Sequence, residues 1–413
     1  MGPLQKDQKH QRALQHMPQL DGLRTLAVAA VLIHHFGGHL PMSLNSVAWG
    51  SLGVRLFFVL SGFLITGILL RSRDLAEASG GGRLLATRQF YVRRCLRIFP
   101  IYYLVIAIAA AINLSPVREL LGWLLTYTLN IQCTLQGWFP DNVSHFWSLA
   151  VEEQFYIIWP WLVLFAPRKW LVRFAVITIA VGSLFRVYIV ASDTTWIAGY
   201  VLPFAALDAL GLGSLLAISA HPTFSTAALR TFFARYALPA GLLGYGVLEF
   251  LWQTGNVSRE YYTALTETTA ALCFSWLVSS AARGFRGPVG AILKSKPILY
   301  CGKITYGIYV YHMFAPLILV KIFSLFGATY SAHGWLNFSF VTSATLITAS
   351  LSWYLFEQPI NSLKRYFSYK PLTASRPANA SDEGEVSFAA IAVGTSIGNE
   401  QLTAIPTVDF VGS

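Results

Sequence analysis

Charged residues are scarce in this sequence. Among its 413 residues, 30 are Lys or Arg and 19 are Asp or Glu, together 12%, about half the share of an ordinary soluble domain. Hydrophobic residues reach 55%, and the mean hydropathy is +0.53. A water-soluble domain, a disordered chain and a collagen are therefore excluded. The class that fits is a polytopic helical membrane protein.

Cysteine is also scarce, and its four residues are far apart in the chain. They are Cys95, Cys133, Cys273 and Cys301, with no CxxC pair and no paired spacing. A disulfide-rich secreted scaffold is excluded, because such folds need several matched cysteine pairs. We expect four free thiols and no metal site.

Long apolar stretches are what the sequence has in abundance. Given the roughly 20 residues that a membrane-spanning helix needs, we expect an all-α bundle of about ten transmembrane helices. The expected spans are 23–40, 52–70, 98–113, 147–166, 171–190, 199–219, 236–253, 262–281, 303–325 and 336–357. The first is interpreted as a retained helix, since no small-x-small cleavage site closely follows it. The stretch 119–131 is apolar but short, which favours an interfacial or re-entrant piece on the outer side.

The basic residues orient these spans. With the N-terminus inside, 24 of the 30 Lys and Arg residues fall in the inner segments, two in outer segments and four within spans. Cytoplasmic loops carry such an excess, so we expect both termini in the cytoplasm. The predicted organisation is a cytoplasmic tail over 1–20, a membrane domain over 21–360, and a cytoplasmic tail over 361–413. We expect the second tail to be disordered, because it is polar and has no helical period.

Ionisable residues within apolar stretches are costly, so those that persist are usually paired or functional. Arg24 and His35 are eleven residues apart, close to three helical turns, so they share a helix face about 16 Å apart along the axis. His34 points about 100° away from that face. A histidine that only donates to a neighbouring helix is the structural alternative.

Arginines cluster just before the third span, in the segment 88–102. Arg93 or Arg94 lies three or four residues before Arg97, so a helix brings one of them onto the same face as Arg97. Arginine forks bind phosphate bidentately. The segment thus predicts a site for a phosphorylated cofactor, with a positive-inside anchor as the alternative.

Two adjacent carboxylates, Glu152 and Glu153, begin the fourth span near its outer end. Glu152 shares a helix face with His145, seven residues before it, and with Tyr156, four residues after it. A structural account needs a buried partner for each acid.

Other candidates are scattered along the chain. Ser61 lies on an expected packing face, and Arg186 and Asp208 suit an interhelical ion pair. The remaining candidates are Tyr306, Tyr309, His312 and Glu357.

Taken together, these segments resemble the acyltransferase 3 family, the multi-pass membrane O-acyltransferases of bacterial glycans and some natural products. The resemblance covers about 20–360 and includes the segments DGLR, FFVLSGFLIT, RRxxRIFPxYY, HFWSLxVEEQFY, LDALG, TYGIYVYH and FEQP. It implies a bundle of about ten transmembrane helices in the bacterial inner (plasma) membrane. It also implies transfer of an acyl group, usually acetyl, from cytoplasmic acyl-coenzyme A to a hydroxyl of a cell-surface or secreted glycan or glycolipid.

On this resemblance we expect no permanently bound cofactor, with acyl-coenzyme A as co-substrate. Our hypothesis makes His35 the general base or a covalent acyl relay, oriented by Glu152, with Glu153 as the less favoured candidate. Arg24 would meet the thioester end or the phosphates of acyl-coenzyme A. The expected phosphate ligands are Arg93, Arg94 and Arg97, and the supporting residues are Ser61, His145, Tyr156, Arg186, Asp208 and His312.

The chain departs from the family pattern in three places. Arg55 stands where many members have Asp, and Ala205 or Ala206 stands where an Arg often precedes the Leu-Asp pair. No hydrolase-like domain follows the last expected span, so the membrane domain would complete transfer alone or with a separate extracytoplasmic partner. A homo-oligomer stays open.

Four other functions compare with this hypothesis as follows. A macrolide or other natural-product O-acyltransferase would belong to the same family. A proton-coupled transporter would also use intramembrane His, Glu and Arg, but the sequence shows no inverted repeat and no matching pair of broken helices. A non-catalytic sensor would need a long soluble domain. Nucleic-acid binding is not expected, because the basic residues are spread over six segments.

Overall fold

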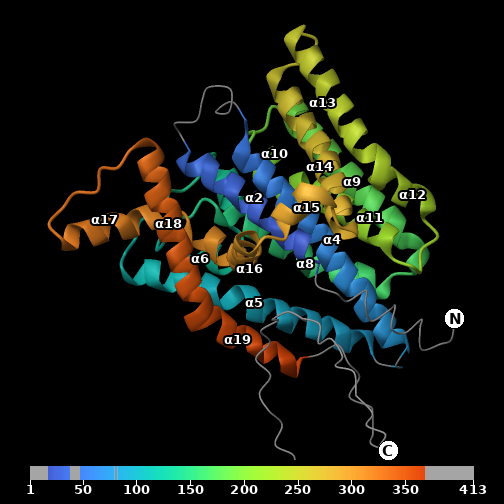
Figure 1. The fold of residues 1–413 in the computed structure, drawn as a ribbon. Helices are drawn as coiled ribbons and strands as arrows, with labels where there is room; N and C mark the ends of the chain where they lie inside the picture. Colours follow the sequence, from blue (N-terminus) through green and yellow to red (C-terminus); the bar gives the residue numbers. More distant parts are fainter. Residues whose placement is uncertain (1–16, 38–46, 79, 81, 368–413) are drawn as a thin grey trace, which may run out of the picture. The chain divides into compact units, whose positions relative to one another are not determined.

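The computed structural model describes residues 17–37, 47–78, 80 and 82–367 (Figure 1). Every regular element in these ranges is helical, which confirms the all-α prediction. The longer helices are α2 (Pro18–Phe36), α4 (Trp49–Ala78), α5 (Arg83–Ala111), α8 (Phe146–Phe165), α9 (Arg168–Ala191), α11 (Pro203–Ala220), α13 (Ala237–Gln253), α14 (Arg259–Arg283), α16 (Lys296–Tyr311), α17 (Ala315–Leu325) and α18 (Gly334–Ser352).

Short helices connect or extend the long ones. They are α6 (Leu121–Leu125), α7 (Leu129–Gln136), α10 (Ala198–Val201), α12 (Ala227–Thr231), α15 (Gly287–Leu293) and α19 (Gln358–Ser362), with π-helical turns at Phe232–Tyr236 and Trp353–Glu357 and a 3₁₀ turn at Leu363–Tyr366. Helix α2 begins slightly before the expected boundary of the membrane domain, and the last turn runs slightly beyond it. Most of the two expected tails lies outside the described residues.

Helices α4 and α11 lie at the centre of the bundle, and their backbones touch. A Cβ added to Gly62 would lie 2.1 Å from the carbonyl oxygen of Leu210, and one added to Gly213 would lie 2.1 Å from that of Val59. Small residues permit this close approach between membrane helices. The expected packing face beside Ser61 is therefore confirmed.

Five helices are long and apolar enough to cross a membrane, or six if a bent pair counts as one span. They are Trp49–Ala78, Arg83–Ala111, Arg168–Ala191, Ala198–Ala220 and Gly334–Tyr366, with α16 and α17 as the bent pair. Large apolar side chains such as Leu243, Leu325 and Leu355 are exposed on outward faces, as expected for helices in contact with lipid. The chain is therefore a multi-pass membrane protein.

Two expected spans differ from the helices observed. The stretch 303–325 was expected to be one helix, but α16 and α17 meet at an angle of 76°. The break falls at His312, Met313 and Phe314, and Pro316 lies in the first turn of α17, where proline is tolerated at a helix start but not in its interior. The third span begins earlier than expected, because α5 includes the whole arginine-rich segment. In 119–131, α6 and the start of α7 are too short to cross a bilayer, as predicted.

Candidate functional site

A polar cavity of about 110 Å³ lies among α2, α4, α5, α8 and α16. Its polar lining consists of Arg24, Arg94, Arg97, Glu152, Ser61, Ser148, Thr305, Tyr306 and Tyr309. Its apolar lining consists of Val54, Phe57, Phe58 and Ile98. We call this space the arginine cavity. It brings together residues that are scattered from position 24 to position 309 of the sequence.

Arg94 and Arg97 come from one face of α5, as the helical spacing predicted, and both line the arginine cavity. The guanidinium of Arg94 lies over the ring of Tyr156, 3.5 Å from its centroid. It is also 3.6 Å from a carboxylate oxygen of Glu152 and 3.4 Å from one of Glu153. Arg97, in contrast, makes no hydrogen bond or ion pair within the described part of the chain.

The two other arginines expected to bind the donor have different surroundings. Arg24 lines the cavity and pairs with Asp21 of its own helix at 2.5 Å. Arg93 does not line the cavity. Its guanidinium donates to the carbonyl oxygens of Lys364 and Phe367, at 3.0 and 3.1 Å. Of the four arginines, Arg24, Arg94 and Arg97 thus line the cavity and Arg93 does not.

Glu152 lines the arginine cavity together with Arg24, whereas His35 does not line it. The hydroxyl of Ser61 donates to Glu152 at 2.6 Å. The expected contact between Glu152 and His35 is not among those of the described residues, because Arg94 and Ser61 surround the carboxylate instead. The axial separation of about 16 Å between Arg24 and His35 accounts for this difference.

His35 belongs to a group of three imidazoles, which we call the histidine cluster. The ring of His35 lies 5.1 Å from that of His312, and the ring of His312 lies 4.8 Å from that of His145, between centroids. His145 and His312 are buried, whereas His35 is exposed. The cluster depends on the fold, because His145 immediately precedes α8 and His312 lies at the break between α16 and α17.

The hydrogen bonds of the two buried histidines define their free nitrogens. Nδ1 of His312 lies 2.6 Å from the carbonyl oxygen of Tyr309, and Nε2 of His145 lies 3.2 Å from that of Val310. A carbonyl oxygen only accepts, so each of these nitrogens carries a hydrogen, and in the neutral ring the other nitrogen has a lone pair. Neither Nε2 of His312 nor Nδ1 of His145 has a hydrogen-bond partner among the described residues. Each of the two buried imidazoles therefore has one ring nitrogen that no described residue uses.

Tyr309 and Ser148 connect the arginine cavity with the histidine cluster. Both line the cavity, and their hydroxyl oxygens are 2.5 Å apart. The hydroxyl of Tyr309 also donates to the carbonyl oxygen of His145 at 3.0 Å. Tyr309 therefore reaches from the lining of the arginine cavity to the histidine cluster, where its ring lies 5.5 Å from that of His312, between centroids.

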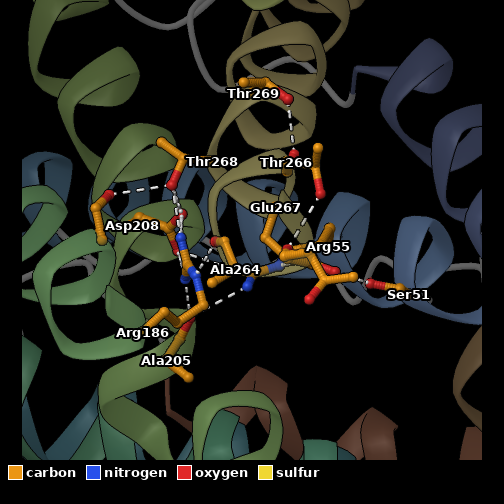
Figure 2. A network of polar contacts seen from close by, with 12 residues as sticks. Ser51, Arg55, Arg186, Ala205, Asp208, Ala264, Thr266, Glu267, Thr268 and Thr269 are labelled. Carbon is orange, nitrogen blue, oxygen red and sulfur yellow. Dashed lines mark hydrogen bonds and ion pairs between the residues drawn. The ribbon is translucent and has the colours of Figure 1, made fainter. Parts of the chain in front are cut away.

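A second set of buried charges lies apart from this path (Figure 2). Arg186 pairs with Asp208 at 2.6 Å, which confirms the predicted ion pair. Arg55 pairs with the other oxygen of Asp208 at 2.7 Å and also with Glu267. We call Arg55, Arg186, Asp208 and Glu267 the buried charge network. Glu267 was missed in the sequence, although an acid within an apolar stretch of α14 was a signal for it.

The two side-chain departures from the family pattern meet in this network. The carbonyl oxygen of Ala205 accepts hydrogen bonds from Arg55, at 3.2 Å, and from Arg186. Further hydrogen bonds come from Thr268 to Asp208 and from Ser51 to Glu267. Arg55 thus contributes a cation that is held by Asp208, Glu267 and the backbone of Ala205.

Comparison with known proteins identifies the domain. The family model described as an acyltransferase domain, Acyl_transf_3, matches residues 17–357. The peptidoglycan O-acetyltransferase OatA of Listeria monocytogenes is 33% identical over 159 residues, 35% of this chain and 24% of that protein. The O-acetyltransferase OatA of Staphylococcus aureus is 26% identical over 322 residues, 72% of this chain and 50% of that protein. The matches thus cover half or less of these relatives' lengths. No solved structure matches.

Proposed function

The chain belongs to the acyltransferase 3 family, and from that premise we propose that it is a membrane O-acyltransferase. It moves an acyl group, acetyl in the first place, from cytoplasmic acyl-coenzyme A to a hydroxyl of a cell-surface or secreted glycan. The observation that carries the proposal is the arginine cavity, which gathers three arginines, with Tyr309 of its lining next to the histidine cluster that includes His35. The O-acetyltransferase relatives support acetyl and a glycan acceptor.

The proposed topology has ten spans with both termini in the cytoplasm. Besides the five candidate helices and the bent pair, α2, α8, α13 and α14 have 19, 20, 17 and 25 residues. Helices of this length can cross a bilayer. The asymmetric distribution of Lys and Arg supports the orientation. This topology places the arginine-rich half of α5 on the cytoplasmic side and His35 toward the outer side.

In the proposed donor site, the arginine cavity takes only one end of acyl-coenzyme A. Its volume of about 110 Å³ is well below the roughly 300–1,000 Å³ of pockets that enclose a whole ligand. Arg97 and Arg24 face the phosphates or the thioester, and Arg97 supplies guanidinium donors that no other described residue uses. Arg94 is held by Tyr156 and the two glutamates, so we assign it to shaping the cavity and balancing charge.

The proposed chemistry breaks the thioester C–S bond and forms an ester C–O bond with the acceptor. The acceptor hydroxyl gives its proton to His35, the exposed member of the histidine cluster, and the departing thiolate of coenzyme A takes up a proton. His312 is close enough to position the imidazole of His35. If His35 instead forms a covalent acyl relay, it receives the acyl group first and passes it to the hydroxyl in a second step.

A proton-coupled transporter is the alternative from another class. The bend between α16 and α17, with buried His312 beside it, resembles the broken helices of transporters. Such transporters have the break in both of two related halves, whereas the described helices include one bent pair. A natural-product acceptor is the alternative within the family.

The proposal is tested with the full-length protein in detergent. Purified protein should release thiol from acetyl-coenzyme A and form an acetyl ester on an added glycan, observed by mass spectrometry. His35→Ala should lower the rate about 10²–10⁴-fold, the usual contribution of a general base, while His34→Ala should retain activity. A transporter would release no thiol. Full ester formation by well-expressed His35→Ala would refute the role of His35.

A further inference from the structure

Two cavities lie on the half of α14 that begins at Arg259. Their volumes are about 880 Å³ and 640 Å³. Arg259, Thr263 and Glu267 line both of them, and this spacing of four residues places the three side chains along one side of the helix. We call the two cavities together the outer cleft. Figure 1 shows α13 and α14 side by side where the larger cavity lies.

The larger cavity has an aromatic wall with fixed polar groups. Trp252 and Tyr262 are stacked, with ring centroids 4.9 Å apart. The hydroxyl of Tyr262 donates to Glu249 at 2.7 Å and lies 3.2 Å from the hydroxyl of Tyr245. Trp252 is 39% exposed and Tyr245 is 47% exposed, so their faces are open to a ligand. Flat apolar faces beside placed hydrogen-bonding groups can bind pyranose rings, which have an apolar face and a rim of hydroxyls.

The charges of the outer cleft select among glycans. Its lining includes the acids Asp193, Glu249, Glu260 and Glu267, against the bases Arg186 and Arg259. Arg186 is already paired with Asp208 and Glu267 with Arg55, which leaves the acids Asp193, Glu249 and Glu260 against the base Arg259. Carboxylates accept hydrogen bonds from sugar hydroxyls but repel phosphate and uronate groups. A neutral oligosaccharide therefore fits this lining better than a polyanion.

The outer cleft also ends beside the proposed chemistry. Ala48, just before α4, and Ser51 of α4 line it, and a Cβ added to Gly50 would meet the ring of His34 at 2.6 Å. The start of α4 thus packs against the end of α2 that carries His35. Glu267, at the wall of both cavities, is held by Ser51 and Arg55.

We propose that the outer cleft binds the acceptor as a neutral oligosaccharide, with Trp252 and Tyr262 as its aromatic platform and Glu249 as a hydroxyl acceptor. This inference rests on the proposed O-acyltransferase function, because that function requires an acceptor site near His35. It adds where the acceptor lies and which class of glycan it is.

The test measures binding to the purified full chain by isothermal titration calorimetry. The probes are two neutral oligomers, N-acetylglucosamine tetramer and maltotetraose, and one anionic oligomer, galacturonic acid tetramer. At least one neutral probe should bind, with weaker binding of the anionic one. Trp252→Ala and Glu249→Gln should each weaken binding at least about tenfold, since each removes more than about 1.4 kcal/mol of contact. Tyr262→Phe, which keeps the ring, should have a smaller effect.

Trp335→Ala is the matched control, because Trp335 is 56% exposed on α18 and lines none of the three cavities described above. It should bind the probes as the unchanged protein does. Size-exclusion profiles establish that each variant is folded. Absence of binding by both neutral probes, undiminished binding by Trp252→Ala, or equal binding of the anionic tetramer would overturn the proposal.

Measuring thiol release from acetyl-coenzyme A in the absence of acceptor distinguishes a failure of the acceptor-site proposal from a failure of the proposed enzyme function. A protein that binds a neutral tetramer through Trp252 but releases no thiol from acetyl-coenzyme A retains the glycan site and loses the proposed enzyme function. A protein that releases thiol and forms esters, but whose acceptor KM is the same in Trp252→Ala, retains the function and loses the outer cleft.

Discussion

The arginine cavity and the buried charge network both hold arginines and carboxylates inside the bundle, yet they differ in how completely the charges are paired. In the network, Arg186 and Arg55 reach Asp208 at 2.6 and 2.7 Å, and Asp208 is fully buried. In the cavity, Arg94 and Glu152 are 3.6 Å apart. Arg97 there makes no hydrogen bond or ion pair with any described residue.

This difference separates a structural role from a binding role. Charges that satisfy one another have no capacity left for a ligand, and removing one of them leaves the others buried without a partner. Charges with unused donors can bind a substrate and contribute less to folding. Substitutions in the network and in the cavity test this contrast.

The largest effect is expected from Asp208→Ala in the network. The change leaves Arg186 without its carboxylate and Arg55 with only Glu267. Breaking a buried ion pair costs about 3–5 kcal/mol, so the folded fraction in detergent and the melting temperature should fall sharply. Asp141→Ala, at an exposed position, should melt like the unchanged protein. Equal melting of the two variants would contradict a structural role for the network.

Arg97→Ala in the cavity should have an intermediate effect, on activity alone. Losing a charged hydrogen bond to the donor costs about 1.5–3 kcal/mol, which raises the KM for acetyl-coenzyme A about 10- to 150-fold. The melting temperature should change little, because no described partner is lost. Arg93→Ala is the control, since its guanidinium binds backbone carbonyls outside the cavity. If Arg93→Ala raised the KM equally, the cavity would not distinguish these arginines.

Ser61→Ala should have the smallest effect of the three. It removes the hydrogen bond to Glu152, worth about 0.5–1.5 kcal/mol, so kcat/KM should fall about two- to tenfold. Ser72→Ala on the same helix is the comparison, because Ser72 donates only within its own helix, to Ile68. A loss of activity as large in Ser72→Ala would assign the effect to packing of α4.

Several local features could be predicted because helical spacing is regular. The shared face of Arg94 and Arg97 and the separation of Arg24 from His35 follow from positions along the chain, whereas the ion pair of Arg186 with Asp208 was predicted from their opposite charges. Helical spacing could not show whether Arg93 or Arg94 lies in the cavity with Arg97, since one is four and the other three residues before it. The decision came from the turn at 363–367, whose carbonyl oxygens bind Arg93.

Other features depended on how helices lie against one another. The expected contact of Glu152 with His35 failed because the relative height of α2 and α8 is not encoded in either helix alone. The histidine cluster needed the break between α16 and α17, which mean hydropathy does not detect. The role of Glu267 depended on its contact with Arg55 of another helix, which the sequence of α14 does not encode.

The amino-acid sequence was sufficient to identify a helical membrane protein with the motifs of an acyltransferase, because composition and motif order do not depend on how the helices pack. Which charges are paired and which line a cavity became clear from the tertiary structure alone. That distinction depends on distances of a few ångströms between helices far apart in the chain, and backbone contacts such as Gly62 on Leu210 set those distances. Asp208 is paired with two arginines, whereas Arg97 lines a cavity and makes no hydrogen bond or ion pair with a described residue.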